Sequence, residues 1–148
     1  MAHTYISAAI HCVFSTKQRV HGIPARVQPD LWAYLGGIAR ANGMKALAVG
    51  GTDNHVHALL TIPAIISIGH AVELLKSGSS KWLHDEHNLA CTWQDGYGAF
   101  TVGVSQIPPT ISYITSQPEH HRKLKFEDEY VAILRKHKIE YDPKFVFG

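Results

Sequence analysis

The chain has 148 residues, of which 45% are hydrophobic, and its formal net charge is +2. This length allows one domain with a real core, and the hydrophobic content argues against extensive disorder. No run is apolar enough to span a bilayer, Met1–Thr4 lacks the basic region of a secretory signal, and two distant cysteines exclude a disulfide framework. We therefore expect one cytoplasmic domain, 1–148, with no membrane contact, whose overall charge alone does not identify a nucleic-acid binder.

The first elements follow from hydrophobic periodicity. Residues 4–15 alternate in character, which predicts a β-strand with His11 on its more polar face. Residues 16–23 are polar and precede Pro24, which predicts a loop. A helix is predicted from Pro29, which suits a first-turn position, to Asn42-Gly43, which supplies the stop.

The rest of the chain supplies three more strands and three helices. Residues 46–51 and 55–62 predict two strands joined as an antiparallel hairpin through the turn 50–54. Ser67 is a predicted cap for a second helix, and an irregular polar stretch follows over 84–98. A short strand is predicted over 99–104 and a helix over 108–117, which ends or kinks at Pro118. A C-terminal helix from 126 to 138 and an extended tail over 141–145 complete the chain.

The order of these elements predicts the architecture. Strand, helix, strand, strand, helix, strand is the order of a ferredoxin-like or RRM-like α+β fold, with a four-stranded antiparallel sheet and two helices on one face. The opposite face is then left for function, with an additional helix, the one at 108–117, over it. If Val56, Ala58 and Leu60 meet the two helices, His55 and His57 point to that opposite face.

Two candidate ligands lie on the strand at 55–62. His55 and His57 are two residues apart, so both imidazoles share one face of a rigid strand, as half of a metal site would require. The same spacing also fits two solvated histidines on a half-exposed sheet. The helix at 108–117 offers further groups: Tyr113 and Gln117 are four residues apart and share one helix face.

The combination of these groups is more informative than each alone. Two imidazoles and the amide oxygen of Gln117 would leave positions open for phosphate oxygens, which suits Mg²⁺ or Mn²⁺. Tyr113 beside such a cation could attack phosphorus. Taken singly, Tyr113 could also be an ordinary tyrosine that packs on a core, and Gln117 could be a solvated residue at a helix C-terminus. Pro118, directly after Gln117, could turn that side chain away.

With these motifs the sequence resembles the single-tyrosine HUH transposases of bacterial insertion sequences and their REP-associated relatives. The matching segments are Asn54–Leu60 for the HUH motif, Tyr113–His121 for the tyrosine helix, Val13–Lys17 and Leu75–Ser80. The resemblance implies that His55, His57 and Gln117 are metal ligands and that Tyr113 is the nucleophile. It implies cleavage of single-stranded DNA at hairpin-containing element ends, through a 5′-phosphotyrosine link, by a homodimer in which Tyr113 could act across subunits.

Basic residues and histidines give candidate DNA contacts, although each also fits a solvated surface. They are Lys17, Arg19, Lys76, Lys81, His120, His121, Arg122 and Lys123. Two alternatives stay open at this point. One is a domesticated REP-associated nickase or transferase with the same chemistry. The other is a non-catalytic module that binds single-stranded nucleic acid on the open sheet, although such modules usually carry aromatic residues on the central strands.

Overall fold

A four-stranded antiparallel sheet forms the middle of the fold. In the computed structural model, which describes residues 3–148, the strands lie in the order β2-β3-β1-β4. They are β1 (Ala9–Ser15), β2 (Lys45–Gly51), β3 (His55–Thr61) and β4 (Gly98–Val102). β1 and β3 pair from Ala9 opposite Thr61 to Ser15 opposite His55. The predicted ferredoxin-like sheet is confirmed, with a first strand that begins at Ala9 rather than Thr4.

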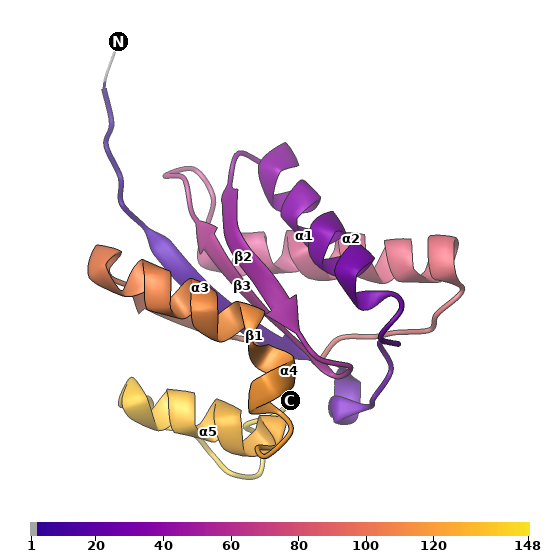
Figure 1. The fold of residues 1–148 in the computed structure, drawn as a ribbon. Coiled ribbons are helices and arrows are strands. Elements are labelled where there is room, and N and C mark those ends of the chain that lie inside the picture. Colours follow the sequence, from indigo (N-terminus) through magenta and orange to yellow (C-terminus); the bar gives the residue numbers. More distant parts are fainter. Residues whose placement is uncertain (1–2) are drawn as a thin grey trace.

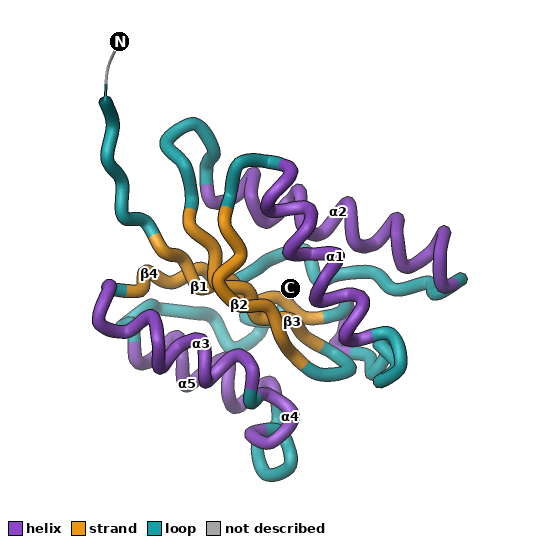
Figure 2. The backbone as a smooth tube through the Cα atoms, turned by 45° about the horizontal axis from the view of Figure 1, so that its top comes forward, coloured by secondary structure: helices purple, strands orange, loops and turns teal. Residues whose placement is uncertain are grey.

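Helices cover both faces of this sheet (Figure 1). α1 (Gln28–Ala41) and α2 (Ile68–His87) lie on one side, and α3 (Ile107–Thr115), α4 (Gln117–His120) and α5 (Phe126–Lys136) lie on the other, as Figure 2 shows. Two short 3₁₀ turns, η1 (Lys17–Arg19) and η2 (Val104–Gln106), follow β1 and β4. None of the helices within residues 3–148 is long and apolar enough to cross a membrane. Met1 and Ala2, part of the stretch considered for a secretory signal, lie outside the described residues.

The face under α1 and α2 holds the main apolar core. β1 and β3 contribute alternate residues to it, as predicted: Ile10, Cys12, Phe14, Val56, Ala58 and Leu60. Ser67 caps α2 as expected, because its hydroxyl accepts the backbone N–H of His70 at 3.1 Å. α2 runs on to His87, where the sequence predicted irregular chain from residue 84. Leu83 is buried in the core, and left-handed Asn88 supplies the stop only after the last turn.

The opposite face is covered rather than open. α3 lies against β2 and β3, and its Ile114 carbonyl oxygen lies 2.4 Å from where a Cβ at Gly50 would be. A side chain at Gly50 would therefore push α3 away from the sheet. α5 packs on β1 and β4 through a second apolar cluster made of Val13, Phe100, Phe126, Tyr130 and Leu134.

The helix predicted over 108–117 is interrupted close to the expected place: α3 ends at Thr115, Ser116 leaves helical geometry, and α4 begins at Gln117. The expectation of an extended tail over 141–145 is wrong, because residues 143–147 form turns. Partly buried Val146 and Phe147 pack against the α5 cluster, and burying this apolar surface stabilises the folded-back tail.

Candidate active site

β3 places two histidines deep under α3–α5. His55 and His57 are fully buried on the sheet face opposite the main core. The Nδ1 atom of each ring has a neighbour that fixes it: His11 Nε2 lies 2.8 Å from His57 Nδ1, and Asn54 Oδ1 lies 2.9 Å from His55 Nδ1. Thr52 Oγ1 is 3.0 Å from the latter atom. Both Nε2 atoms are therefore free to face one point, the usual arrangement of metal-ligating histidines.

Gln117 reaches the same point from α4. Its amide oxygen Oε1 lies 2.8 Å from His55 Nε2, and its amide nitrogen donates to Glu129 Oε2 at 2.9 Å. The side chain is fully buried. The interruption between α3 and α4 falls before Gln117, and Pro118 occupies the first turn of α4, where proline is tolerated. Pro118 therefore does not turn Gln117 away from the histidines.

We call His11, His55 and His57 the histidine cluster. Tyr113 lies at the edge of this cluster, one turn before Gln117. Its hydroxyl donates to Glu129 Oε2, and its ring centroid is 5.6 Å from that of His57. Burial first, and then the neighbouring carboxylate, raise the pKa of Tyr113, so the phenol is protonated in this arrangement. His120, exposed on α4, packs its ring against Tyr113 with centroids 4.9 Å apart.

Glu129 of α5 is a member of this candidate site that sequence reasoning missed. Only 2% of it is exposed, and its Oε1 lies 3.2 Å from His57 Nε2 and 3.0 Å from His121 Nε2. Burial alone would raise its pKa, but hydrogen bonds from His121, His57 and Tyr113 outweigh burial and hold the pKa below its usual range. A signal was present: Glu129 lies on the same stripe of α5 as Phe126 and Tyr130, and a charge on a buried stripe needs partners.

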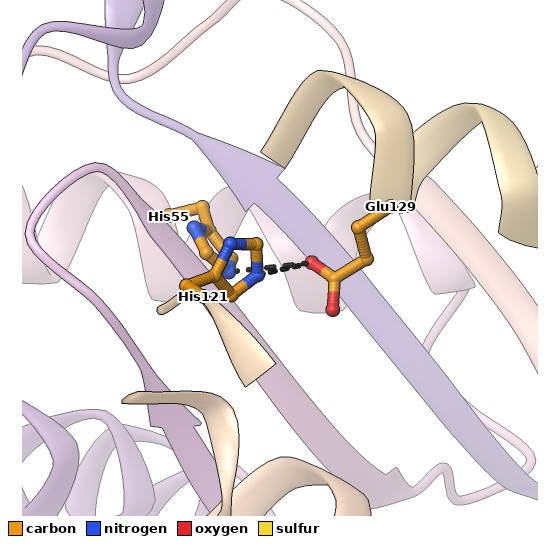
Figure 3. Close-up of side chains that lie close together, drawn as sticks. All are labelled: His55, His121 and Glu129. Carbon is orange, nitrogen blue, oxygen red and sulfur yellow. Dashed lines mark hydrogen bonds and ion pairs between the residues drawn. The ribbon is translucent and has the colours of Figure 1, made fainter. Parts of the chain in front are cut away.

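Figure 3 shows how His121 joins this group from the turn after α4. The ligand atoms of His55, His121 and Glu129 all lie within 4.8 Å of one another, so these residues could hold a metal ion. Burial lowers the pKa of His121, but the hydrogen bond to Glu129 and the charge of Glu129, together with smaller contributions from Leu124 and Asp53, outweigh burial and leave the pKa raised. His121 was predicted as a DNA contact, whereas the structure brings it to the histidine cluster.

The hydrogen bonding of His55 tests whether this group fits a cation. Burial first, then the nearby His57, lowers the pKa of His55 to about 3, so the ring is neutral and has one N–H. Nδ1 faces Asn54 Oδ1 and the oxygen of Thr52, whose hydroxyl donates to Asn54 Oδ1, and the tautomer that carries the N–H on Nδ1 satisfies both of these acceptors. Nε2 then directs its lone pair at the amide oxygen of Gln117. Two acceptors then face each other with no hydrogen atom between them. A cation between His55 Nε2 and the Gln117 oxygen would be bound by both lone pairs, and the ligand atoms present therefore fit a metal.

A groove opens beside the cluster and carries part of the predicted DNA contacts. Its volume is about 1090 Å³, and it lies between the loop after β1 and the segment that follows α4. The groove is lined by more positive than negative side chains. The cationic ones are Arg19, Arg122, Lys123 and Lys125, and the carboxylates are Asp53 and Glu127. The buried Nε of Arg19 makes no hydrogen bond to any residue that the structure describes. His121 lines the groove and also contacts Glu129, so it lies between the groove and the histidine cluster.

The remaining predicted contacts lie elsewhere. Lys76 donates to the carbonyl oxygens of Gln94 and Gly96 at 2.7 and 2.6 Å, which anchors the loop before β4 and uses its charge structurally. Lys81 is exposed on α2, on the far side of the sheet, within 3.8 Å of Asp85. Lys17 is exposed on η1 but does not line the groove. Of the predicted DNA contacts, the groove therefore contains Arg19, His121, Arg122 and Lys123, whereas His120 lies against Tyr113.

Comparison with known families gives the geometry its context. The sequence model of the family described as "Transposase IS200 like" matches residues 4–117. This chain belongs to the IS200-like transposase family. The matched region contains His55, His57, Tyr113 and Gln117 but ends before His121 and Glu129. No curated protein matches the chain in sequence.

Solved structures support the same family fold. A crystal structure of a Deinococcus radiodurans R1 protein assigned as a transposase is 25% identical, with a TM-score of 0.59, and the match covers 78% of this chain and 97% of that one. A REP-associated tyrosine transposase bound to a REP hairpin has a TM-score of 0.58 over 82% of this chain and 74% of its own. Its identity is 12%, so this second match shows the fold alone.

Proposed function

We propose that this IS200-like transposase cleaves and rejoins single-stranded DNA with Tyr113 as its nucleophile and a divalent cation as its cofactor. The observation that supports this most directly is the convergence of Tyr113, His57 and Gln117 on one buried carboxylate, Glu129. A packing tyrosine would not need two histidines and an amide around it. The proposal includes hairpin-containing DNA as substrate and a homodimeric enzyme, both of which the family resemblance implies.

The cation would be Mg²⁺ or Mn²⁺, held by His55, His57 and Gln117. His121 and Glu129 are further donors within reach of the same point. A mixed set of imidazole nitrogens, an amide oxygen and a carboxylate suits these ions, and Mn²⁺ accepts imidazole more readily than Mg²⁺ does. When bound, the cation polarises a phosphodiester and offsets the environment that raises the pKa of Tyr113.

The chain's own residues account for the bond changes. The Tyr113 oxygen attacks phosphorus, and its proton passes to Glu129 Oε2, the atom to which the hydroxyl already donates. A P–O bond forms to tyrosine while the bond from phosphorus to the 3′ oxygen breaks, and that oxygen takes up a proton from solvent water and leaves as a 3′-OH. The 5′-phosphotyrosine keeps the energy of the phosphodiester. A 3′-OH can therefore attack it later, restoring the phosphodiester and releasing Tyr113.

The basic groove provides a path for the strand. Its cations can neutralise phosphates, which is the main source of affinity for single strands. Both catalytic histidines are fully buried, so His121 and the turn that carries it have to move before a phosphate reaches them. An enzyme with this activity acts on bacterial DNA and therefore in the cytoplasm.

The decisive experiment is Tyr113→Phe. Radiolabelled single-stranded DNA from the ends of the protein's own locus, incubated with Mn²⁺ or Mg²⁺, should give a covalent protein–DNA adduct on a denaturing gel. The variant should give none, because it lacks the attacking oxygen, while its affinity for hairpin DNA stays close to that of the wild type. Tyr34→Phe, on the far side of the sheet, is the matched control. An adduct of undiminished yield with Tyr113→Phe would overturn the assignment.

A further inference from the structure

The C-terminal tail, which folds back after α5, contacts the groove through one aromatic side chain. Phe147 lies outside the region that the family model matches, and the guanidinium of Arg19 lies over its ring, with the Arg19 Cζ atom 4.7 Å from the ring centroid. We infer that Phe147 is a positioning residue, which holds Arg19 so that its guanidinium binds a backbone phosphate of single-stranded DNA. This inference rests on the proposed function, because it takes DNA as the ligand of the groove.

The backbone of Arg19 is fixed in an uncommon conformation. Gln18 and Arg19 have φ angles of 57° and 54°, in the left-handed region that residues other than glycine rarely adopt. The Arg19 N–H donates to the carbonyl oxygen of Thr16 at 2.9 Å, and the Arg19 carbonyl oxygen accepts from Asn54 Nδ2 at 3.4 Å. This turn directs the Arg19 side chain to the groove that it lines. Strained residues that their surroundings hold in place are typical of ligand clamps.

The guanidinium of Arg19 has a hydrogen-bond donor to spare. Its Nε is buried and makes no hydrogen bond to any residue from 3 to 148. The exposed carboxylate of Glu127 comes only within 3.9 Å of this atom, which is too far for a hydrogen bond. A buried donor without a partner is costly, and a phosphate oxygen would satisfy it. The arginine fork suits this ligand because two of its N–H groups can bind two phosphate oxygens at once.

The ring of Phe147 is itself held from two directions. It packs on α5, with its centroid 6.0 Å from that of Tyr130 and 6.5 Å from that of Phe126. The Phe147 carbonyl oxygen accepts from Gln94 Nε2 at 3.5 Å, and Gln94 Oε1 accepts the backbone N–H of Ser15 at 2.7 Å. The tail is thereby tied both to α5 and to the end of β1, directly before the turn that lines the groove.

Stacking determines which part of the guanidinium remains available. A guanidinium that lies over an aromatic ring gives its face to the ring and keeps its N–H groups, which lie in its own plane, for other partners. Phe147 therefore holds Arg19 without occupying its donors, whereas a carboxylate in the same place would bind them. The positive charge also stays uncompensated by the ring, so it can still attract a phosphate.

Arg19 is linked to the histidine cluster through one side chain. Asn54 donates to the Arg19 carbonyl oxygen, and its own Oδ1 lies 2.9 Å from His55 Nδ1. We therefore expect a strand that is anchored at Arg19 to lie close to the histidine cluster.

Two substitutions of Phe147 test the inference. Fluorescein-labelled oligothymidine, which forms no hairpin, is titrated with the protein at several salt concentrations, with EDTA in the buffer, and binding is followed by fluorescence anisotropy. Phe147→Leu keeps an apolar side chain but has no aromatic face. It should weaken binding about tenfold and reduce the slope of log affinity against log salt by about 0.7, the value for one lost phosphate contact. Phe147→Tyr keeps the ring and should bind as the wild type does.

Arg19→Ala shows whether the effect of Phe147 passes through Arg19. Arg19→Ala should cause the same two losses as Phe147→Leu, and the double variant should lose no more than Arg19→Ala alone, because both changes remove one contact. Phe145→Ala is the matched control: its side chain belongs to the same tail and is 72% exposed, so both quantities should stay at the wild-type values. Circular dichroism would verify that each variant is folded.

An unchanged salt slope in folded Phe147→Leu would overturn the inference, because a neutral residue that only packs the tail has no reason to alter a charge-dependent quantity. An unchanged slope in Arg19→Ala, or a wild-type protein that does not bind the oligonucleotide, would overturn it as well. The assay contains no metal and forms no adduct. A failure of Tyr113 as the nucleophile would therefore leave this result valid, so the two proposals can fail separately.

Discussion

The side chains on the two faces of strand β3 differ in how specific their contacts with other elements have to be. Val56, Ala58 and Leu60 meet apolar residues of α1 and α2, and any side chains of suitable size and polarity can fill such a core. His55 and His57, on the other face, need particular atoms from other elements: an amide oxygen from α4 and a carboxylate from α5. Stability on the first face is therefore distributed over many contacts, whereas on the second face a few polar contacts set the geometry.

The largest effect on stability is expected on the apolar face. Phe14 is fully buried and packs edge-on against Trp93 with ring centroids 5.0 Å apart. Phe14→Ala should lower the free energy of unfolding by about 3–5 kcal/mol, because it removes packing and leaves a cavity. His57→Ala should cost about 1–3 kcal/mol, the penalty for unpaired buried polar groups. Urea unfolding followed by circular dichroism measures both, and the reverse order would contradict the comparison.

The difference between the faces also explains what the sequence could and could not predict. Alternation in β1 and β3 is a local property, so it correctly placed Phe14 in the core and the histidines on the other face. The helical spacing of Tyr113 and Gln117 is local as well. Glu129 is 72 residues from His57, and no short-range pattern states where α5 packs. The sheet therefore followed from the sequence, whereas the carboxylate at the middle of the site did not.

An effect of intermediate size, on activity, is expected where β2 supports α3, the helix that carries Tyr113. Gly50 has no side chain, and a Cβ there would lie 2.4 Å from the carbonyl oxygen of Ile114. Because that atom belongs to the backbone, Gly50→Ala has to displace α3, and with it Tyr113. We expect a loss of about tenfold or more in adduct formation, since the phenol moves away from its partners.

Gly103→Ala is the matched control for this change. An added Cβ at Gly103 meets nothing within 4 Å, so this variant should retain wild-type activity. Circular dichroism would verify that both variants are folded. Full activity of Gly50→Ala would mean that the contact between α3 and β2 does not position the tyrosine, and that the two faces are less coupled than the structure indicates.

The smallest effect concerns the groove. Lys123 is exposed and lines it, so Lys123→Ala should weaken binding of single-stranded DNA modestly and reduce the slope of log affinity against log salt by about 0.7, the value for one lost phosphate contact. Lys81→Ala, an exposed lysine on α2 behind the opposite face, should change neither quantity. Fluorescence anisotropy at several salt concentrations measures both. An equal change for the two lysines would mean that DNA is attracted by overall charge, and the path through the groove would then lose its support.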